Sequence, residues 1–190
     1  VPGGGSVAAL AGALAAALAQ MVAGLTIGKK KYAAVDVEMK EIALKAVSLG
    51  NTLGALVKRD ADAYAKVSAA YKLEKEPAEA ASRRAHAVTS ALIEAAEVPL
   101  ETARRCVEVA ELAAIVADKG NSNAVTDAGV AALLAEAAAR GAAYNVRVNV
   151  NALGEKSKGA ELAREAARLV AQVEQLARKT AVSVNKALEG

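Results

Sequence analysis

Two aspartates stand at positions where a helical pattern expects apolar side chains. Asp60 continues a stripe of apolar residues with spacings of three or four, namely Met39, Ile42, Ala46, Leu49, Leu53 and Leu56. Asp127 begins a second stripe of this kind, which runs on through Val130 and Leu134. A carboxylate there is costly unless it is paired or hydrogen-bonded, so such groups often belong to functional clefts. Each aspartate also has a structural alternative. Asp60 could form an ion pair with a basic residue of another chain, and Asp127 could be a carboxylate in the first turn of its helix, where the helix dipole favours it.

Polar side chains that suit a flat heterocycle accompany both aspartates. Asn145 and Asn149 are four residues apart and share one line of a helix. Each amide offers donors and an acceptor, which match alternating N–H and C=O groups of a ligand. Tyr64 lies one turn from Asp60 and can flank it. The alternative for the asparagines is hydrogen bonding across a helix interface.

A glycine-rich start precedes the first helix. Gly3, Gly4 and Gly5 allow a ligand to approach the backbone closely, and Ser6 is expected to be the N-cap of a helix that reaches Ile27. The first amides of such a helix have no intrahelical acceptor and suit a carboxylate, phosphate or carbonyl oxygen. The alternative is a flexible leader before an ordinary helix.

The elements that must position these groups are helices. Hydrophobic residues make up 54% of the 190 residues, yet Phe and Trp are absent, a composition that favours close-packed helices. We expect one domain, 1–190, that forms an all-α antiparallel bundle. Asp36 is expected to cap the second helix, and Thr126 or a neighbour the fourth. Val98-Pro99 is expected to kink or restart the third helix. The expected helices cover 7–27, 36–73, 77–118, 126–151 and a final segment after a turn at 153–157.

The first of these helices is apolar on all sides. It must therefore be buried, either by the other helices of its own chain or in a homodimer, because small residues such as Gly12 and Ala16 let another helix approach. Its uncharged length also suffices to cross a bilayer. However, alanine drives insertion weakly and Gln20 interrupts the run, so burial in a dimeric bundle without membrane attachment is the preferred interpretation.

Several classes of function are disfavoured by composition. The net charge is only +3, and stacking aromatics and a basic stripe are both missing, so nucleic-acid binding is not expected. No cluster of Cys and His predicts a metal site. The lone Cys106 indicates a reducing, cytoplasmic setting. Catalysis by Cys106 with His86 is the weaker alternative to a buried cysteine and a surface histidine.

The motifs together resemble a known family. They are Pro2-Gly-Gly-Gly-Ser6, Gly28-Lys-Lys-Lys-Tyr32, Asp60-Ala-Asp-Ala-Tyr64, Gly120-Asn121 with Asp127, and Gly141 with Asn145 and Asn149. In this order they resemble the cyclodeaminase/cyclohydrolase family over essentially the whole chain. That family includes the cyclodeaminase part of formiminotransferase-cyclodeaminase and stand-alone methenyltetrahydrofolate cyclohydrolases.

The resemblance implies a helical homodimer that acts on a folate one-carbon unit and needs no cofactor beyond that substrate. Since no formiminotransferase-like part is recognisable, we expect hydrolysis of 5,10-methenyltetrahydrofolate to 10-formyltetrahydrofolate. The alternatives are formimidoyltetrahydrofolate cyclodeaminase activity, which releases ammonia, and a non-catalytic folate-binding or structural dimer.

The resemblance also implies roles for particular residues. Asp60 or Asp127 would be the base and electrostatic partner of the cationic ring. Amides of Gly3 to Ser6 would bind carbonyl or carboxylate oxygens. The other expected contacts are side chains that orient or pack on the substrate: Asn121, Asn145 and Asn149 for the pterin or the water, Lys29 and Lys31 for the glutamate tail, and Tyr32, Tyr64 and Tyr144 for the pterin face.

Overall fold

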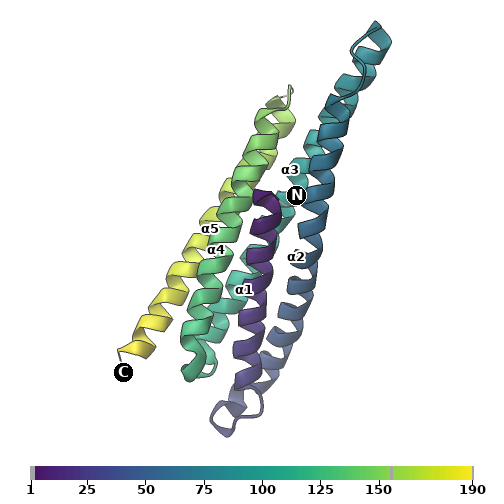
Figure 1. Cartoon of the computed structure of the whole chain (residues 1–190). Coiled ribbons are helices and arrows are strands. Elements are labelled where there is room, and N and C mark those ends of the chain that lie inside the picture. Colours follow the sequence, from purple (N-terminus) through teal and green to yellow (C-terminus); the bar gives the residue numbers. More distant parts are fainter. Residues whose placement is uncertain (1–2, 155, 190) are drawn as a thin grey trace.

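Five long helices account for most of the chain (Figure 1). The computed structural model describes residues 3–154 and 156–189. Its elements in order are α1 (Gly4–Thr26), η1 (Lys30–Val35), α2 (Asp36–Tyr71), α3 (Ala78–Lys119), η2 (Ser122–Ala124), α4 (Val125–Asn151) and α5 (Lys156–Leu188). The expected all-helical fold is confirmed. Glu155 and Pro2, which belong to the expected last turn and to the first motif, lie outside the described residues.

Helix α1 lies between α2 and α4, with α3 behind it (Figure 1). Its inward face consists of small residues such as Ala9, Ala16 and Ala19, all fully buried. A Cβ at Gly12 would lie 3.0 Å from the Cys106 sulfur and 3.1 Å from Leu53 Cδ2. Glycine at this position therefore lets α1 approach α2 and α3 as closely as it does.

The apolar stripe of α2 packs inward as expected. Met39, Leu53 and Leu56 are completely buried, and Ala63 and Val67 continue the same line one and two turns past Asp60. Asp60 itself is half-buried. The apolar stripe thus continues through Asp60 as predicted, and the half-buried carboxylate lies at the edge of the core.

The expected N-terminal caps are wrong by one to three residues. Helix α1 begins at Gly4 with Gly3 as N-cap, because the Ser6 hydroxyl turns toward Asp60 and does not cap its own helix. Asp36 is the first residue of α2, and its carboxylate accepts the Gly28 N–H at 2.7 Å. Gly28 has φ of +75°, a conformation that glycine adopts most easily. Helix α4 begins at Val125, ahead of Thr126, after the short turn η2.

Of the kink or restart expected at Val98-Pro99, the restart does not occur. Helix α3 runs unbroken through Pro99. Proline has no N–H, so the carbonyl of Ala95, four residues earlier, loses its helical partner. The side chain of Asn149 in α4 donates to that carbonyl at 2.8 Å. A cross-helix bond thus replaces the missing one and keeps α3 continuous.

Helix α5 is tied to α3 by a two-point ion pair. Arg104 Nε and Nη2 contact the two carboxylate oxygens of Glu165 at 2.8 and 2.9 Å. This hydrogen bonding holds the pKa of Glu165 below its ordinary value and raises that of Arg104. The expected inward stripe of α5 is also found, with Ala166, Leu169 and Val173 buried.

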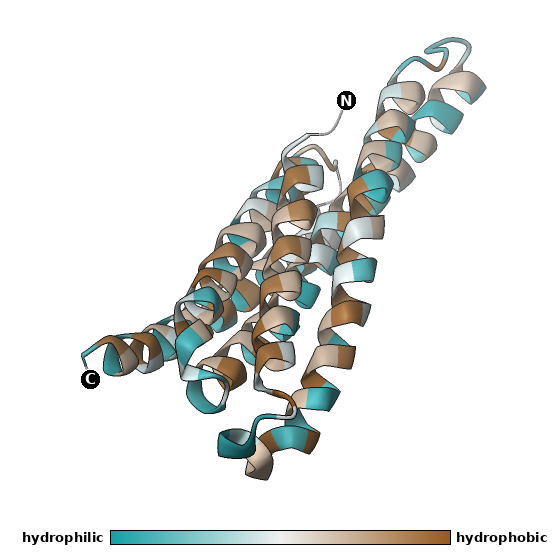
Figure 2. Cartoon of the chain, turned by 60° about the horizontal axis from the view of Figure 1, so that its bottom comes forward, coloured by the Kyte–Doolittle hydropathy of each residue, from teal (hydrophilic) through white to brown (hydrophobic). Residues whose placement is uncertain are grey.

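The other helices of the chain do not cover α1 on all sides, so burial within a single chain, one of the two alternatives for this helix, is wrong. One face is open, and Leu14 and Leu10 keep 54% and 50% of their surface exposed. Figure 2 shows apolar or neutral residues along nearly the whole of α1. Among the described helices, only α1 is long and apolar enough to cross a membrane. Core helices of soluble proteins can have the same length and composition. The fold alone therefore leaves a continuous apolar surface uncovered.

Candidate active site

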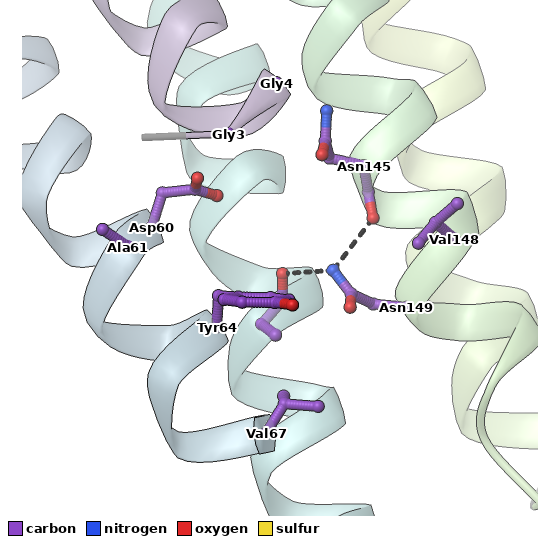
Figure 3. Close-up of a pocket in the computed structure, with 10 residues that line it drawn as sticks. Gly3, Gly4, Asp60, Ala61, Tyr64, Val67, Asn145, Val148 and Asn149 are labelled. Carbon is purple, nitrogen blue, oxygen red and sulfur yellow. Dashed lines mark hydrogen bonds between the residues drawn. The ribbon is translucent and has the colours of Figure 1, made fainter. Parts of the chain in front are cut away.

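A cavity of about 480 Å³ opens beyond the N-terminus of α1 (Figure 3). Helices α2 and α4 form its walls, and α3 contributes Ala95. Its size falls within the range of small-molecule sites. The lining residues are Gly3, Gly4, Asp60, Ala61, Tyr64, Val67, Ala95, Asn145, Val148 and Asn149. Six of the residues proposed from the sequence thus meet here: Gly3, Gly4, Asp60, Tyr64, Asn145 and Asn149.

Asp60 is held against the first turn of α1. The buried Ser6 hydroxyl lies 2.8 Å from Asp60 Oδ2 and 3.1 Å from the Val57 carbonyl. A Cβ at Gly5 would collide with the Asp60 carboxylate. The glycine therefore creates the space for the carboxylate, and the serine orients it. The carboxylate thus lies at the positive end of the α1 dipole, an electrostatically favourable position for an acidic side chain.

The two asparagines hold the α4 wall. Asn149 donates to the carbonyls of Ala95 and Asn145, at 2.8 and 3.0 Å, which uses both of its amide hydrogens. Asn145 donates to the Gly141 carbonyl at 2.8 Å. The expected interface role is thus real for Asn149. Each side chain also lines the cavity, where both carboxamide oxygens and the second amide hydrogen of Asn145 are left for a ligand.

Tyr64 and the apolar lining complete the cavity. The Tyr64 ring reaches toward Asn149 across the opening, with 72% of the residue exposed (Figure 3). Ala61, Ala95 and Val148 also line the cavity and were not proposed from the sequence. Two of these could have been predicted as lining residues from the sequence. Ala61 adjoins Asp60, and Val148 lies three residues after Asn145 on the same helix. Among the described lining residues, Asp60 is the only charged one. The cavity therefore suits a neutral or cationic flat ring.

Five other proposed residues lie at the opposite end of the bundle, whereas Tyr144 precedes Asn145 on α4 and is not among the residues that line the cavity. Lys29, Lys31 and Tyr32 follow the end of α1, while Asn121 and Asp127 flank the start of α4. With 23 residues, α1 separates the two ends by about 34 Å. The expectation of one polar site is therefore wrong for a single chain. This separation could have been predicted from the sequence. In a bundle whose successive helices alternate in direction, the start of α1 lies at the same end as the ends of α2 and α4, and the end of α1 lies at the opposite end.

At this second end the polar groups bind one another. The Ser122 N–H donates to the Tyr32 oxygen at 2.9 Å, and Lys31 lies 5.3 Å from the Tyr32 ring centre. Hydrogen bonds with Ser122 lower the pKa of Tyr32 below its ordinary value. Asn121 donates from its side chain to the Leu25 carbonyl and accepts the Asn123 N–H. Asn121 thus joins the end of α1 to the start of α4.

The alternative nucleophile is excluded by position. Cys106 is fully buried, and burial raises the pKa of its thiol to about 12. His86 is exposed on the same helix, about 30 Å away along the axis. The two side chains therefore cannot cooperate. Within residues 3–154 and 156–189, no group of three or more His, Cys, Asp or Glu side chains is arranged to hold a metal ion.

The fold and this cavity define an all-helical protein with a partly polar cavity at the N-terminus of a core helix. The chain belongs to the formiminotransferase-cyclodeaminase family, whose model matches residues 1–183. The family suggested by the sequence motifs is thereby confirmed.

Individual relatives cover most of the chain. It is 44% identical to the methenyltetrahydrofolate cyclohydrolase of Methylorubrum extorquens, over 90% of this chain and 82% of that protein. It is 37% identical to the formimidoyltransferase-cyclodeaminase of Mus musculus, over 78% of this chain but only 28% of the mouse protein. The crystal structure of formiminotetrahydrofolate cyclodeaminase from Thermotoga maritima superposes with a TM-score of 0.89 at 30% identity, covering 98% of this chain and 89% of that one.

Proposed function

We propose that this protein is an enzyme of folate one-carbon metabolism that hydrolyses 5,10-methenyltetrahydrofolate to 10-formyltetrahydrofolate. The observation that carries the proposal is the Asp60 carboxylate, fixed by Ser6 in a cavity whose described lining contains no lysine or arginine. The methenyl bridge is an amidinium-like cation, so a single oriented carboxylate is its electrostatic complement. The 44% identity to a cyclohydrolase along most of both chains supports the same reaction.

The chemistry needs a water, a base and an orienting wall. Water attacks the methenyl carbon, and Asp60 accepts one of its protons. The resulting tetrahedral carbon loses its bond to N5 while its oxygen becomes the formyl carbonyl. N5 gains the proton that Asp60 took from the water, and the hydroxyl proton, which leaves as the carbonyl forms, passes through Asp60 to solvent. Asn145 and Asn149 present their amide oxygens to the pterin, and the ring lies against Tyr64.

Cyclodeamination is the second candidate function. The superposition on the Thermotoga maritima cyclodeaminase over nearly the whole chain favours it. Attack by N10 on a formimino carbon forms a tetrahedral centre at the same carbon, and ammonia leaves. The same carboxylate serves either reaction. The two reactions differ in the group that leaves the tetrahedral carbon, which is N5 in the hydrolysis and ammonia in the cyclodeamination. A folate-binding dimer without turnover is the third candidate.

The wider setting is part of the proposal. Residues 1–190 form a single domain and an antiparallel bundle, as supported by the packing of the start of α1 near the end of α4. Two copies associate through the exposed face of α1, which leaves no lipid-facing surface there. The protein acts in the cytoplasm, where a free Cys106 stays reduced. It uses the folate as its only small-molecule partner, with no cofactor or metal and no nucleic acid.

Ultraviolet absorbance of methenyltetrahydrofolate tests the reaction directly. Wild-type protein accelerates loss of the methenyl absorbance, and Asp60→Asn lowers kcat by about 10² to 10⁴. Asp62→Asn is the matched control, because Asp62 is exposed and pairs with Lys58 on the surface. A wild-type rate equal to spontaneous hydrolysis contradicts the cyclohydrolase proposal. Ammonia release from formimino-folate then identifies the cyclodeaminase, and binding without turnover identifies the non-catalytic dimer.

A further inference from the structure

Pro99 influences the cavity although it is not among the residues that line it. Because a proline has no N–H, it leaves the carbonyl of Ala95, four residues earlier in α3, without its helical donor, and its ring crowds that carbonyl. Ala95 belongs to the cavity lining. The carbonyl takes its donor from a neighbouring helix instead, the side chain of Asn149 on α4, at 2.8 Å.

This bond fixes the direction in which the Asn149 carboxamide points. Its nitrogen donates to two backbone carbonyls, that of Ala95 at 2.8 Å and that of Asn145 at 3.0 Å (Figure 3). A carbonyl can only accept, so the reverse orientation would set the Asn149 oxygen against two other oxygens. With both amide hydrogens used, this half-buried side chain offers the cavity an acceptor and no donor.

Asn145, one turn earlier, is less constrained. It donates one amide hydrogen to the Gly141 carbonyl at 2.8 Å and keeps the second hydrogen and its oxygen for a ligand. Turning the carboxamide over would therefore cost Asn145 one hydrogen bond but Asn149 two. Asp60 contributes further acceptor oxygens to the same lining. The α4 wall thus has one acceptor of fixed direction, the Asn149 oxygen.

A ligand must bring an N–H group to this oxygen. The pyrimidine part of a pterin has such an edge, where the 2-amino group adjoins N3–H, whereas the 4-carbonyl can only accept. The 2-amino group is the outermost donor of that edge. A ligand without it leaves the Asn149 oxygen unpaired, which lowers affinity by about 10- to 100-fold.

We propose that Asn149 is a specificity-determining residue and that Pro99 is its positioning residue. The Asn149 oxygen accepts a hydrogen bond from the 2-amino group of the pterin, and Pro99 maintains this orientation by keeping the Ala95 carbonyl free for the amide. The pyrimidine end of the ring then faces α4, and the methenyl end faces Asp60 on α2. This inference rests on the proposed function for the identity of its ligand.

A pair of substrates tests the recognition. Wild-type protein uses 5,10-methenyltetrahydrofolate with a kcat/KM at least tenfold above that of an analogue with methyl in place of the 2-amino group. In Asn149→Ala/Pro99→Ala this ratio falls to about one to two, because the acceptor is absent. The second substitution supplies the Ala95 carbonyl with a backbone donor, so α3 no longer needs the Asn149 bond. A wild-type ratio in the double variant overturns the role of Asn149.

Pro99→Ala alone tests the positioning role. The Ala95 carbonyl then has a donor within α3, so the Asn149 amide keeps one backbone partner and can turn over. We expect KM for methenyltetrahydrofolate to rise about three- to tenfold with kcat nearly unchanged, and the substrate ratio to fall. Gly54→Ala is the control for added helix stability, because a Cβ there meets nothing within 4 Å, and it retains the wild-type ratio. A wild-type KM and ratio in Pro99→Ala overturn the role of Pro99.

Binding separates the recognition from the proposed reaction. Tetrahydrofolate and its 2-methyl analogue have the same rings and no methenyl bridge to hydrolyse, so calorimetric titration compares their affinities without turnover. A tenfold preference for tetrahydrofolate in a protein that lacks turnover means that the proposed function fails and the recognition stands. Turnover without any preference between the paired compounds means the reverse. A protein that neither turns over nor binds these compounds overturns both.

Discussion

Gly5 and Asp60 act as one unit at the scale of single residues. The absent side chain of Gly5 provides the space into which the carboxylate fits, and the Ser6 hydroxyl fixes its direction. Helical periodicity was sufficient to single out Asp60, because a charged residue interrupted a regular stripe. Periodicity did not reveal its contacts, since Ser6 and Asp60 are 54 residues apart in the chain.

Gly5→Ala separates this packing role from helix propensity. Alanine normally stabilises a helix by about 1 kcal/mol relative to glycine. At Gly5 the added methyl group displaces the Asp60 carboxylate, so we expect kcat/KM to fall at least tenfold. Gly54→Ala is the control: its Cβ meets nothing within 4 Å, and we expect unchanged turnover with a slightly higher unfolding free energy. Wild-type kcat/KM in Gly5→Ala would show that the carboxylate position does not matter.

At the scale of elements, α3 and α4 depend on each other through Pro99 and Asn149. The sequence shows the proline but not the side chain that replaces its missing hydrogen bond. A restart at Val98-Pro99 was therefore the natural expectation, and the long-range bond from Asn149 makes it wrong. Helix identities and approximate ends were predictable, because they depend on local periodicity and loop residues. The N-caps were less predictable than the helices, because the side chains of Ser6 and Asp36 bind groups outside the ends of their own helices.

A double-mutant cycle measures this dependence. Asn149→Ala leaves the Ala95 carbonyl without a donor and lowers the unfolding free energy by about 1 to 3 kcal/mol. Pro99→Ala supplies an N–H to the same carbonyl, so the cost of Asn149→Ala becomes smaller in that background. Urea unfolding of the four proteins gives a coupling energy, which we expect to be at least about 0.5 kcal/mol. Strictly additive effects would show that the Asn149 bond does not compensate for the proline.

At the scale of the whole molecule, one face of α1 stays open. The sequence predicted that this helix needs cover all round, and the single chain leaves the face with Leu10 and Leu14 exposed. The sequence did not predict that the candidate site residues divide between two ends, because motif order carries no information on distance. The division follows from the length of α1, whose 23 residues separate the two ends.

Leu14→Glu tests whether this face is the interface of the proposed dimer. Leu14 is 54% exposed in the single chain, so the charged variant retains its helix content by circular dichroism. In a dimer that packs on the α1 face, the introduced carboxylate would lose its contact with water without gaining a partner. We expect a monomer in sedimentation experiments. Val182→Glu is the matched control, because Val182 is 68% exposed on α5, and we expect this variant to remain a dimer. An intact Leu14→Glu dimer would contradict the α1 interface.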